Sequence, residues 1–256
     1  MTLARTHLAL VLAPLAFAAT SRADERLFTY SYQATTIPAG QVELETWATF
    51  SHRTPAEPGA RSFQFRHELE IGLTDRIQLD VYLADWSSTR AAHGEPTHTQ
   101  YDDSAVVLKI AYLDPHTDGI GLASYHEVKV GDEFLEFENK LLLQKNWERW
   151  TFVYNLTLEA EWEGSHYEER SGEIANTFGA AYECSPAFFV GGELIHELPL
   201  PDWHGGEDAI VFAGPDASYR FGGANDWWVT ATAVKQLTDE DDEPEWQFRM
   251  IVGLSF

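Results

Sequence analysis

The sequence predicts an all-β protein, a single twelve-stranded antiparallel transmembrane β-barrel of the outer-membrane type. Three observations lead to this prediction. Apolar and polar residues alternate with period two over most of the chain, which indicates strands with two chemically different faces. There are twelve such runs, an even number. Short turns and longer polar loops separate most of them in alternation, as is typical of barrels that cross an outer membrane.

The composition excludes several other classes of protein. The chain has 256 residues, with 41 Asp and Glu against 17 Lys and Arg, so a phosphate backbone would repel it and no nucleic-acid partner is expected. One Cys rules out a disulfide framework or a multi-Cys metal site. A hydrophobic content of 44% is too high for a disordered acidic chain. After the leading segment, no run approaches the roughly 20 apolar residues of a membrane helix.

The leading segment predicts export. Residues 1–23 have the layout of a secretory signal peptide: Arg5 gives a positive start, residues 8–19 are apolar, and small residues surround the expected cleavage point. Residues 24–40 follow, with alternating aromatic residues at 28, 30 and 32. We leave three arrangements open for them, namely a periplasmic lead-in, a plug in the lumen or an extra pairing strand. Residues 41–256 are assigned to the barrel.

Three runs show the alternation most clearly. Between 63 and 73 every odd position except His67 is apolar and every even one is polar or Gly. The run 77–83 repeats the pattern after a three-residue turn, and 150–162 begins and ends on Trp. Lengths of about ten to thirteen residues suit tilted strands that cross an apolar band. The predicted strands cover about 41–53, 62–73, 77–88, 103–113, 120–130, 135–145, 150–162, 173–184, 187–198, 209–221, 227–237 and 246–256.

The segments between the strands assign the two ends of the barrel. Short turns are expected at 74–76, 146–149, 185–186 and 222–226, and longer loops at 54–61, 89–102, 163–172, 199–208 and 238–245. The segments 114–119 and 131–134 do not fit this alternation. Since outer-membrane barrels have short periplasmic turns, both termini are predicted to be periplasmic.

Aromatic residues near the strand ends fit the girdles that outer-membrane barrels place at the membrane interfaces. The alternative is a soluble periplasmic β-sandwich or lipocalin-like barrel, which would turn its apolar face inward. The residues assigned to the girdles are Trp47, Tyr82, Trp86, Tyr112, Trp150, Trp162, Trp227 and Trp228.

Four segments carry a family resemblance. The chain ends in an alternating strand, 250–256, that closes on Phe256, and it begins with the aromatic segment 28–47. The segments 136–145 and 155–159 add an internal pattern. Together they resemble a family of exported, porin-like outer-membrane barrels of unknown function. The resemblance implies the barrel fold and a place in the bacterial outer membrane, with lipid and the barrel assembly machinery as partners, and it implies no chemistry.

If the apolar face meets lipid, the other face lines the lumen. Its charged residues comprise twelve acids and five bases, a net charge of −7. Excess carboxylate in a narrow aqueous pore attracts cations, so the expected function is a passive channel for small solutes with a cation-preferring lumen. The alternative is a plugged barrel with a scaffold role, in which the charges pair across strands. No cofactor and no metal site is expected. The lumen candidates are Glu43, Glu45, Arg66, Glu68, Glu70, Asp80, Lys109, Glu127, Lys129, Glu136, Glu138, Lys140, Glu159, Glu161, Glu193, Glu197 and Arg249.

The lipid-facing side offers a second alternative. A tight connection at 131–134 places His126 opposite Asn139, with Ser124 two residues away on the same face. A hydroxyl, an imidazole and an orienting amide could serve as nucleophile, base and orienting group. The set resembles the lipid-facing site of outer-membrane phospholipases, with the order of Ser and His reversed. We expect the chain not to be an enzyme and keep a lipid hydrolase as an alternative.

Overall fold

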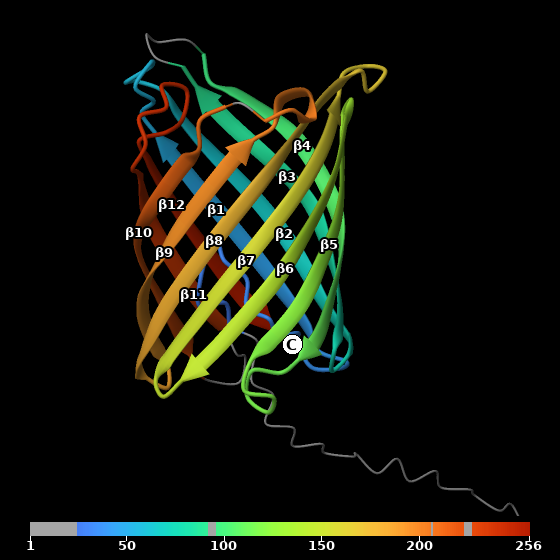
Figure 1. Cartoon of the computed structure of the whole chain (residues 1–256), viewed down its shortest axis with the longest axis vertical. Helices are drawn as coiled ribbons and strands as arrows, with labels where there is room; N and C mark the ends of the chain where they lie inside the picture. The colour runs from blue at the N-terminus through green and yellow to red at the C-terminus, as the bar shows by residue number, and fades with distance from the viewer. Residues whose placement is uncertain (1–24, 92–95, 206, 223–226) are drawn as a thin grey trace, which may run out of the picture.

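The computed structural model describes residues 25–91, 96–205, 207–222 and 227–256. Twelve antiparallel strands form a closed barrel in which each strand pairs with its neighbours in sequence and β1 pairs with β12 (Figure 1). The predicted fold class is confirmed. The predicted signal peptide, residues 1–23, lies outside the described residues. The strands are β1 (Val42–His52), β2 (Arg61–Thr74), β3 (Ile77–Arg90), β4 (His98–Leu113), β5 (Gly121–Gly131), β6 (Phe134–Trp147), β7 (Trp150–Glu163), β8 (Glu169–Ser185), β9 (Phe188–Pro199), β10 (Ile210–Phe221), β11 (Trp227–Gln236) and β12 (Trp246–Ser255), and the short helix η2 spans Pro201–Trp203.

Most strand ends lie within two residues of the predicted ones, with two larger differences. β4 begins five residues earlier than predicted, at His98, and β8 begins four residues earlier, at Glu169. Both extensions lie at the end of the barrel that carries the longer loops. Apart from Tyr101 and Gly172 they consist of polar residues, so they show no hydrophobic period although their backbones continue the ladder of hydrogen bonds.

The two ends of the barrel differ as predicted. The start of β1 and the end of the chain lie together, since Val42 and Phe256 exchange backbone hydrogen bonds of 3.4 and 3.0 Å. This end also carries the short turns, and we call it the turn end (Figure 1). The opposite end, called the loop end, carries η2 and the longer loops. One tight connection lies there, because β5 and β6 are joined by two residues only, the second of which, Glu133, has a φ of 56°.

The outer face of the barrel is apolar and the inner face is polar. Along β1, buried residues at odd positions alternate with half-buried ones at even positions. No helix in the described part of the chain is long and apolar enough to cross a membrane. An apolar surface of this extent indicates a face that lies against another apolar phase. Exposed outer residues include Val106, Leu108, Val128, Val130, Phe137, Leu141 and Leu158.

Three residues assigned to the aromatic girdles point into the lumen instead. Trp47, Tyr82 and Trp228 have exposed fractions of 5%, 0% and 0%. The reason is the phase of their own strands: Trp47 shares its face with Glu45, and Tyr82 shares its face with Asp80. The prediction was wrong for these three. The other five, Trp86, Tyr112, Trp150, Trp162 and Trp227, lie on the outward-facing positions of their strands.

Candidate functional site: the lumen and its plug

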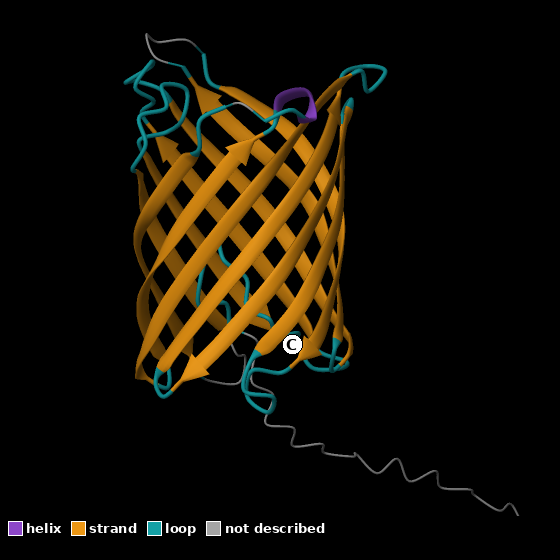
Figure 2. Cartoon of the chain, viewed as in Figure 1, coloured by secondary structure: helices purple, strands orange, loops and turns teal. Residues whose placement is uncertain are grey.

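Residues 25–37 lie inside the barrel and residues 38–41 connect them to β1 at its rim; we call the segment 25–41 the plug. It enters at the turn end, contains no helix or strand, and occupies the lower part of the lumen in Figure 2. Phe28, Ala34 and Ile37 are 0%, 0% and 1% exposed. Of the three arrangements left open by the sequence, the structure has the segment in the lumen. A segment without a pairing strand must find other partners for its backbone N–H groups.

Glu193 of β9 provides such a partner at the innermost part of the plug. Its carboxylate accepts hydrogen bonds from the backbone N–H groups of Thr29 (3.1 Å), Tyr30 (3.0 Å) and Ser31 (2.8 Å). The hydroxyl of Thr232 donates to the same carboxylate at 3.0 Å. Hydrogen bonds to an ionised acceptor are roughly twice as strong as neutral ones, so this carboxylate fixes the turn of the plug.

Side-chain amides of the barrel wall hold the rest of the plug. Asn155 of β7 accepts from the N–H of Tyr32 at 2.7 Å and donates to its carbonyl at 3.0 Å, as a neighbouring strand would. Two glutamines accept further backbone N–H groups in the same way. The pairs are Ala34 with Gln144 (2.9 Å) and Ile37 with Gln78 (2.9 Å).

A glycine in β8 makes room for the plug. A Cβ added at Gly179 would lie 2.7 Å from two ring carbons of Phe28 and 2.9 Å from a methyl group of Val153. Such a distance is too short for two non-bonded carbon atoms. Any larger residue at this position of β8 would therefore push the ring of Phe28 out of its place. The plug and this part of the wall are therefore fitted to each other.

Cations and aromatic rings alternate around the plug. The guanidinium of Arg26 lies 4.0 Å from the ring centre of Tyr32 and 4.4 Å from that of Trp47, and its Nη1 is 3.6 Å from a carboxylate oxygen of Glu45. Arg249 of β12 lies 4.0 Å from the ring centre of Tyr30. Cation–π contacts strengthen when they are removed from water, so these contacts add to the attachment of the plug.

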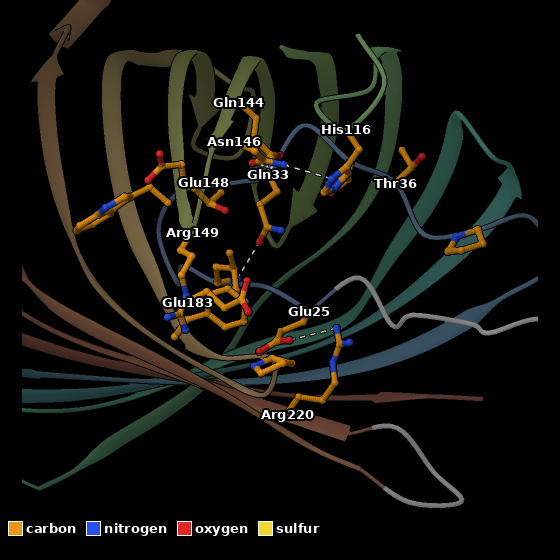
Figure 3. A pocket seen from close by; sticks show the side chains of 17 residues that line it. Glu25, Gln33, Thr36, His116, Gln144, Asn146, Glu148, Arg149, Glu183 and Arg220 are labelled. Atoms are coloured by element: carbon orange, nitrogen blue, oxygen red, sulfur yellow. Dashed lines mark hydrogen bonds and ion pairs between the residues drawn. The ribbon is translucent and has the colours of Figure 1, made fainter. Parts of the chain in front are cut away.

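The plug has a cavity on each side. The cavity at the turn end has a volume of about 470 Å³ and is lined by the plug and by the turns of the barrel. Figure 3 shows it, with Glu25 of the plug paired to Arg220 of β10 at 3.1 Å. The other cavity, of about 350 Å³, lies between Tyr30 and Tyr32 of the plug and the inner wall. The lumen therefore holds space for water on both sides of the plug.

The structure places all seventeen lumen candidates on inward-facing positions of their strands. Further carboxylates share this face. Asp85 was missed because a bulge in β3 after Tyr82 reverses the phase of the strand. Glu173 lies at the predicted start of its strand, where the phase is least certain. They include Asp85, Asp102, Asp103, Glu173, Glu183 and Asp216.

Charges of the two signs are unevenly distributed along the lumen. The inner cavity of about 350 Å³ is lined by four acids and four bases: Glu127, Glu138, Glu173 and Glu197 with Arg66, Lys129, Lys140 and Arg249. Several are paired, for example Lys129 with Glu136 at 2.9 Å. The excess of acid lies elsewhere, in the wall of β1, β2 and β3. The buried carboxylates there are Glu43, Glu45, Glu68, Glu70 and Asp80.

The lipid-facing residues singled out by the sequence are hydrogen-bonded to one another. β5 and β6 pair in the predicted register, with His126 opposite Asn139. Nδ1 of His126 lies 2.7 Å from Oδ1 of Asn139, and Nε2 lies 3.0 Å from Oγ of Ser124. The hydroxyl of Tyr112 in β4 is 2.8 Å from the same Oγ. Polar groups that face lipid satisfy one another, and these four form a continuous chain.

Solved structures similar to this chain are outer-membrane barrels. The COG4313 outer membrane channel from Pseudomonas putida F1 shares 14% identity over 87% of this chain and 97% of its own, with a TM-score of 0.58. The NanC porin shares 10% over 83% and 98%, with a TM-score of 0.52. A KdgM porin in complex with disordered oligogalacturonate shares 10% over 84% and 98%, with a TM-score of 0.51. These likenesses show the fold.

The comparisons of sequence give one match, to a protein family. None of the curated proteins matches the chain. The sequence profile of a family of unknown function, DUF6662, matches residues 20–249, which include the plug and nearly all of the barrel.

Proposed function

The chain belongs to the DUF6662 family of unknown function, and from this premise we propose that it is a passive channel for small solutes in the bacterial outer membrane. The observation that carries the proposal is the pair of cavities, of about 470 and 350 Å³, on the two sides of the plug in a closed barrel. Their walls are charged, and charged walls hold water rather than an apolar filling. The similarity to outer-membrane channels supports the location and the transport class.

The charges of the lumen predict a modest preference for cations. The seventeen lumen candidates have a net charge of −7, which attracts cations into a narrow pore. The inner cavity itself is lined by equal numbers of acids and bases. Because paired charges largely cancel each other's electrostatic potential in this cavity, the preference for cations should be weaker than the net charge of the lumen alone would give.

Recordings from planar bilayers test this proposal. The purified protein should give discrete channels of small conductance, because the plug narrows the lumen. Under a KCl gradient, the reversal potential should shift toward the equilibrium potential of K⁺. A variant that lacks residues 25–36 should conduct more. If the complete protein does not conduct and the variant does, the segment closes the lumen; if neither conducts, the charges of the wall close it, and in both cases the barrel is a plugged scaffold. A reversal potential that shifts toward the equilibrium potential of Cl⁻ would contradict the assigned selectivity.

One specific observation favours a second candidate function, an ester hydrolase on the outer wall of the barrel. The order of hydrogen bonds, Ser124 to His126 to Asn139, is that of a nucleophile, a base and a group that orients the base. The hydroxyl of Tyr112 lies 2.8 Å from the same Oγ, and we propose that it donates to the oxygen that becomes negative during attack. We propose lipid esters as the substrate class, since this wall faces the membrane.

The reaction would proceed in two steps. Oγ of Ser124 attacks the ester carbonyl carbon while its proton passes to Nε2 of His126. The bond to the alcohol then breaks, His126 returns the proton to the departing alkoxide, and an acyl-serine remains. A water molecule gives a proton to His126 as it attacks this ester, and the acid leaves as the serine is restored. Asn139 accepts from Nδ1–H throughout and holds the imidazole in place.

Hydrolysis of phospholipid in vesicles tests the second candidate. The protein should release fatty acid, and Ser124→Ala should reduce the rate at least about a hundredfold, as loss of a nucleophile does. Thr46→Val is a matched control, because Thr46 and His67 form an outward-facing hydroxyl–imidazole pair of 3.2 Å. If the two variants hydrolyse lipid equally, the three residues only satisfy each other's hydrogen bonds.

A further inference from the structure

We infer that Glu68, Glu70 and Asp80 form a binding site for a hard divalent cation in the inner wall of the barrel. The site is independent of the proposed transport function. It lies where β2 and β3 pair near the turn end, beside the plug, and it uses carboxylate oxygens only. Oxygen ligands of this kind select Ca²⁺ or Mg²⁺ over softer metals.

The register of β2 and β3 brings the three carboxylates together. Glu70 lies directly opposite Asp80, and Glu68 lies opposite Tyr82, the next inward-facing position of β3. One oxygen of each carboxylate lies within 4.8 Å of the other two. Two oxygens that bind one Ca²⁺ at its usual distances are at most about 5 Å apart. The separation is therefore within the reach of a single Ca²⁺.

A second observation distinguishes this cluster from an ordinary group of acids. Glu68 is 0% exposed, and neither of its carboxylate oxygens has a hydrogen-bond partner within the described chain. Asp80 is better satisfied, since it accepts a hydrogen bond of 2.9 Å from Nε2 of Gln78. A buried carboxylate without a partner is strongly disfavoured. Glu68 therefore requires a counter-ion or a proton, and its oxygens point toward two further carboxylates.

The neighbouring acids are less available as ligands. Glu43, Glu45 and Glu70 also come within 4.8 Å of one another. However, the indole N–H of Trp228 donates to Glu43 at 3.1 Å, and that of Trp47 donates to Glu45 at 2.7 Å. Glu45 is also paired with the plug. The cation is therefore best placed among the carboxylates of β2 and β3.

The balance of charge around the cluster points to a divalent ion. The three site carboxylates are joined by Glu43 and Glu45, which gives five acids. The cations that face them are Arg26 of the plug and Lys109 of β4, which lies beside Gln78 and attracts Asp80. Arg66 also attracts Glu68, but it is itself paired with Asp85 at 2.6 Å, so this pair adds one charge of each sign. With the Arg66–Asp85 pair included, six negative charges against three positive ones leave an excess of three in a region away from bulk water. One divalent cation would reduce this excess to one.

Calcium binding to the full-length protein in detergent tests the inference. After treatment with a chelator, the protein should take up Ca²⁺ at a single saturable site in isothermal titration, and its Tm should rise with the Ca²⁺ concentration. Glu68→Gln and Asp80→Asn should each weaken Ca²⁺ binding at least about tenfold, because each removes a charged ligand. Glu197→Gln is the matched control, a lumen carboxylate on β9 that should leave binding unchanged.

Three results would overturn the site. The first is that the chelated protein binds no Ca²⁺ at millimolar concentrations. The second is that Glu68→Gln, Asp80→Asn and Glu197→Gln all bind like the unaltered protein, which would place the ion elsewhere. The third is that acid raises the Tm while Ca²⁺ has no effect, which would assign the neutralisation to protons. Titration of the unaltered protein decides the question even if a variant fails to fold.

Discussion

Glu193 joins the barrel to the plug through one carboxylate and three consecutive backbone N–H groups. We predict that Glu193→Gln releases the plug more often, because the amide offers one acceptor oxygen in place of two and brings an NH₂ group toward the N–H donors. A lost hydrogen bond to a charged group costs about 1.5–3 kcal/mol. Openings to the larger conductance should therefore be about ten- to a hundredfold more frequent in planar bilayers.

Glu197→Gln serves as the control for this variant. Glu197 lies on the same face of β9, four residues further along the strand, and lines the inner cavity. Its substitution exchanges a lumen carboxyl group for an amide in the same way, without removing a hydrogen bond to the backbone at 29–31. Equal opening frequencies in the two variants would show that Glu193 acts only through its charge.

At the level of the element, the loop between β11 and β12 combines acidic residues with internal hydrogen bonds. Nε2 of Gln236 donates to the backbone carbonyls of Glu240 and Glu243 at 3.3 and 3.2 Å. Burial, followed by the nearby charges of Asp242 and Glu240, raises the pKa of Glu243. The folded loop therefore binds a proton more tightly than the unfolded loop does, so it gains stability as the pH falls through this raised pKa.

This sign leads to a prediction for the loop. Lowering the pH from about 8 to about 5, a range above the ordinary pKa of Glu, should raise the protection factors of the amides in 237–245, that is, their hydrogen exchange relative to the intrinsic rate at the same pH should slow. Glu243→Gln should raise these protection factors at the higher pH and remove their dependence on pH, because the amide never ionises. Glu57→Gln, in the neighbouring loop, is the control. If the protection of 237–245 still depends on pH in Glu243→Gln, another acid is responsible for the effect.

At the level of the whole molecule, the apolar outer face determines where the protein can fold. Leu158 lies near the middle of β7 and is 51% exposed on that face. A charged residue on the lipid side of a barrel costs about 2–4 kcal/mol at the centre of the bilayer. We predict that Leu158→Arg lowers the free energy of unfolding in lipid vesicles by this amount, measured by urea titration.

The adjacent position provides the comparison for Leu158→Arg. Glu159 faces the lumen. It lies opposite Glu173 of β8, and the nearby carboxylate of Glu136 repels it. Glu159→Arg should change the stability by less than about 1 kcal/mol, since it introduces a cation among acids. Equal losses in the two variants would mean that the outer face does not meet lipid.

The sequence alone determined the number of strands, their approximate bounds and most of the lumen face. Period-two alternation is a local property, and a closed barrel in lipid requires it along every strand. The same phase could have placed Trp47 and Tyr82 inside the lumen, because each shares its face with an acid of the same strand. The register of the β5–β6 hairpin was also predictable, since two residues join the strands.

Only the tertiary structure decided what fills the lumen. The plug has no period that selects its partners, and its backbone N–H groups bind side chains more than 100 residues away, such as Glu193 and Asn155. The bulge that turns Asp85 inward leaves no local signal in β3. The lone buried carboxylate of Glu68 is likewise visible only after the barrel closes. Alternation fixes which way a side chain points, whereas closure and bulges fix what it meets there.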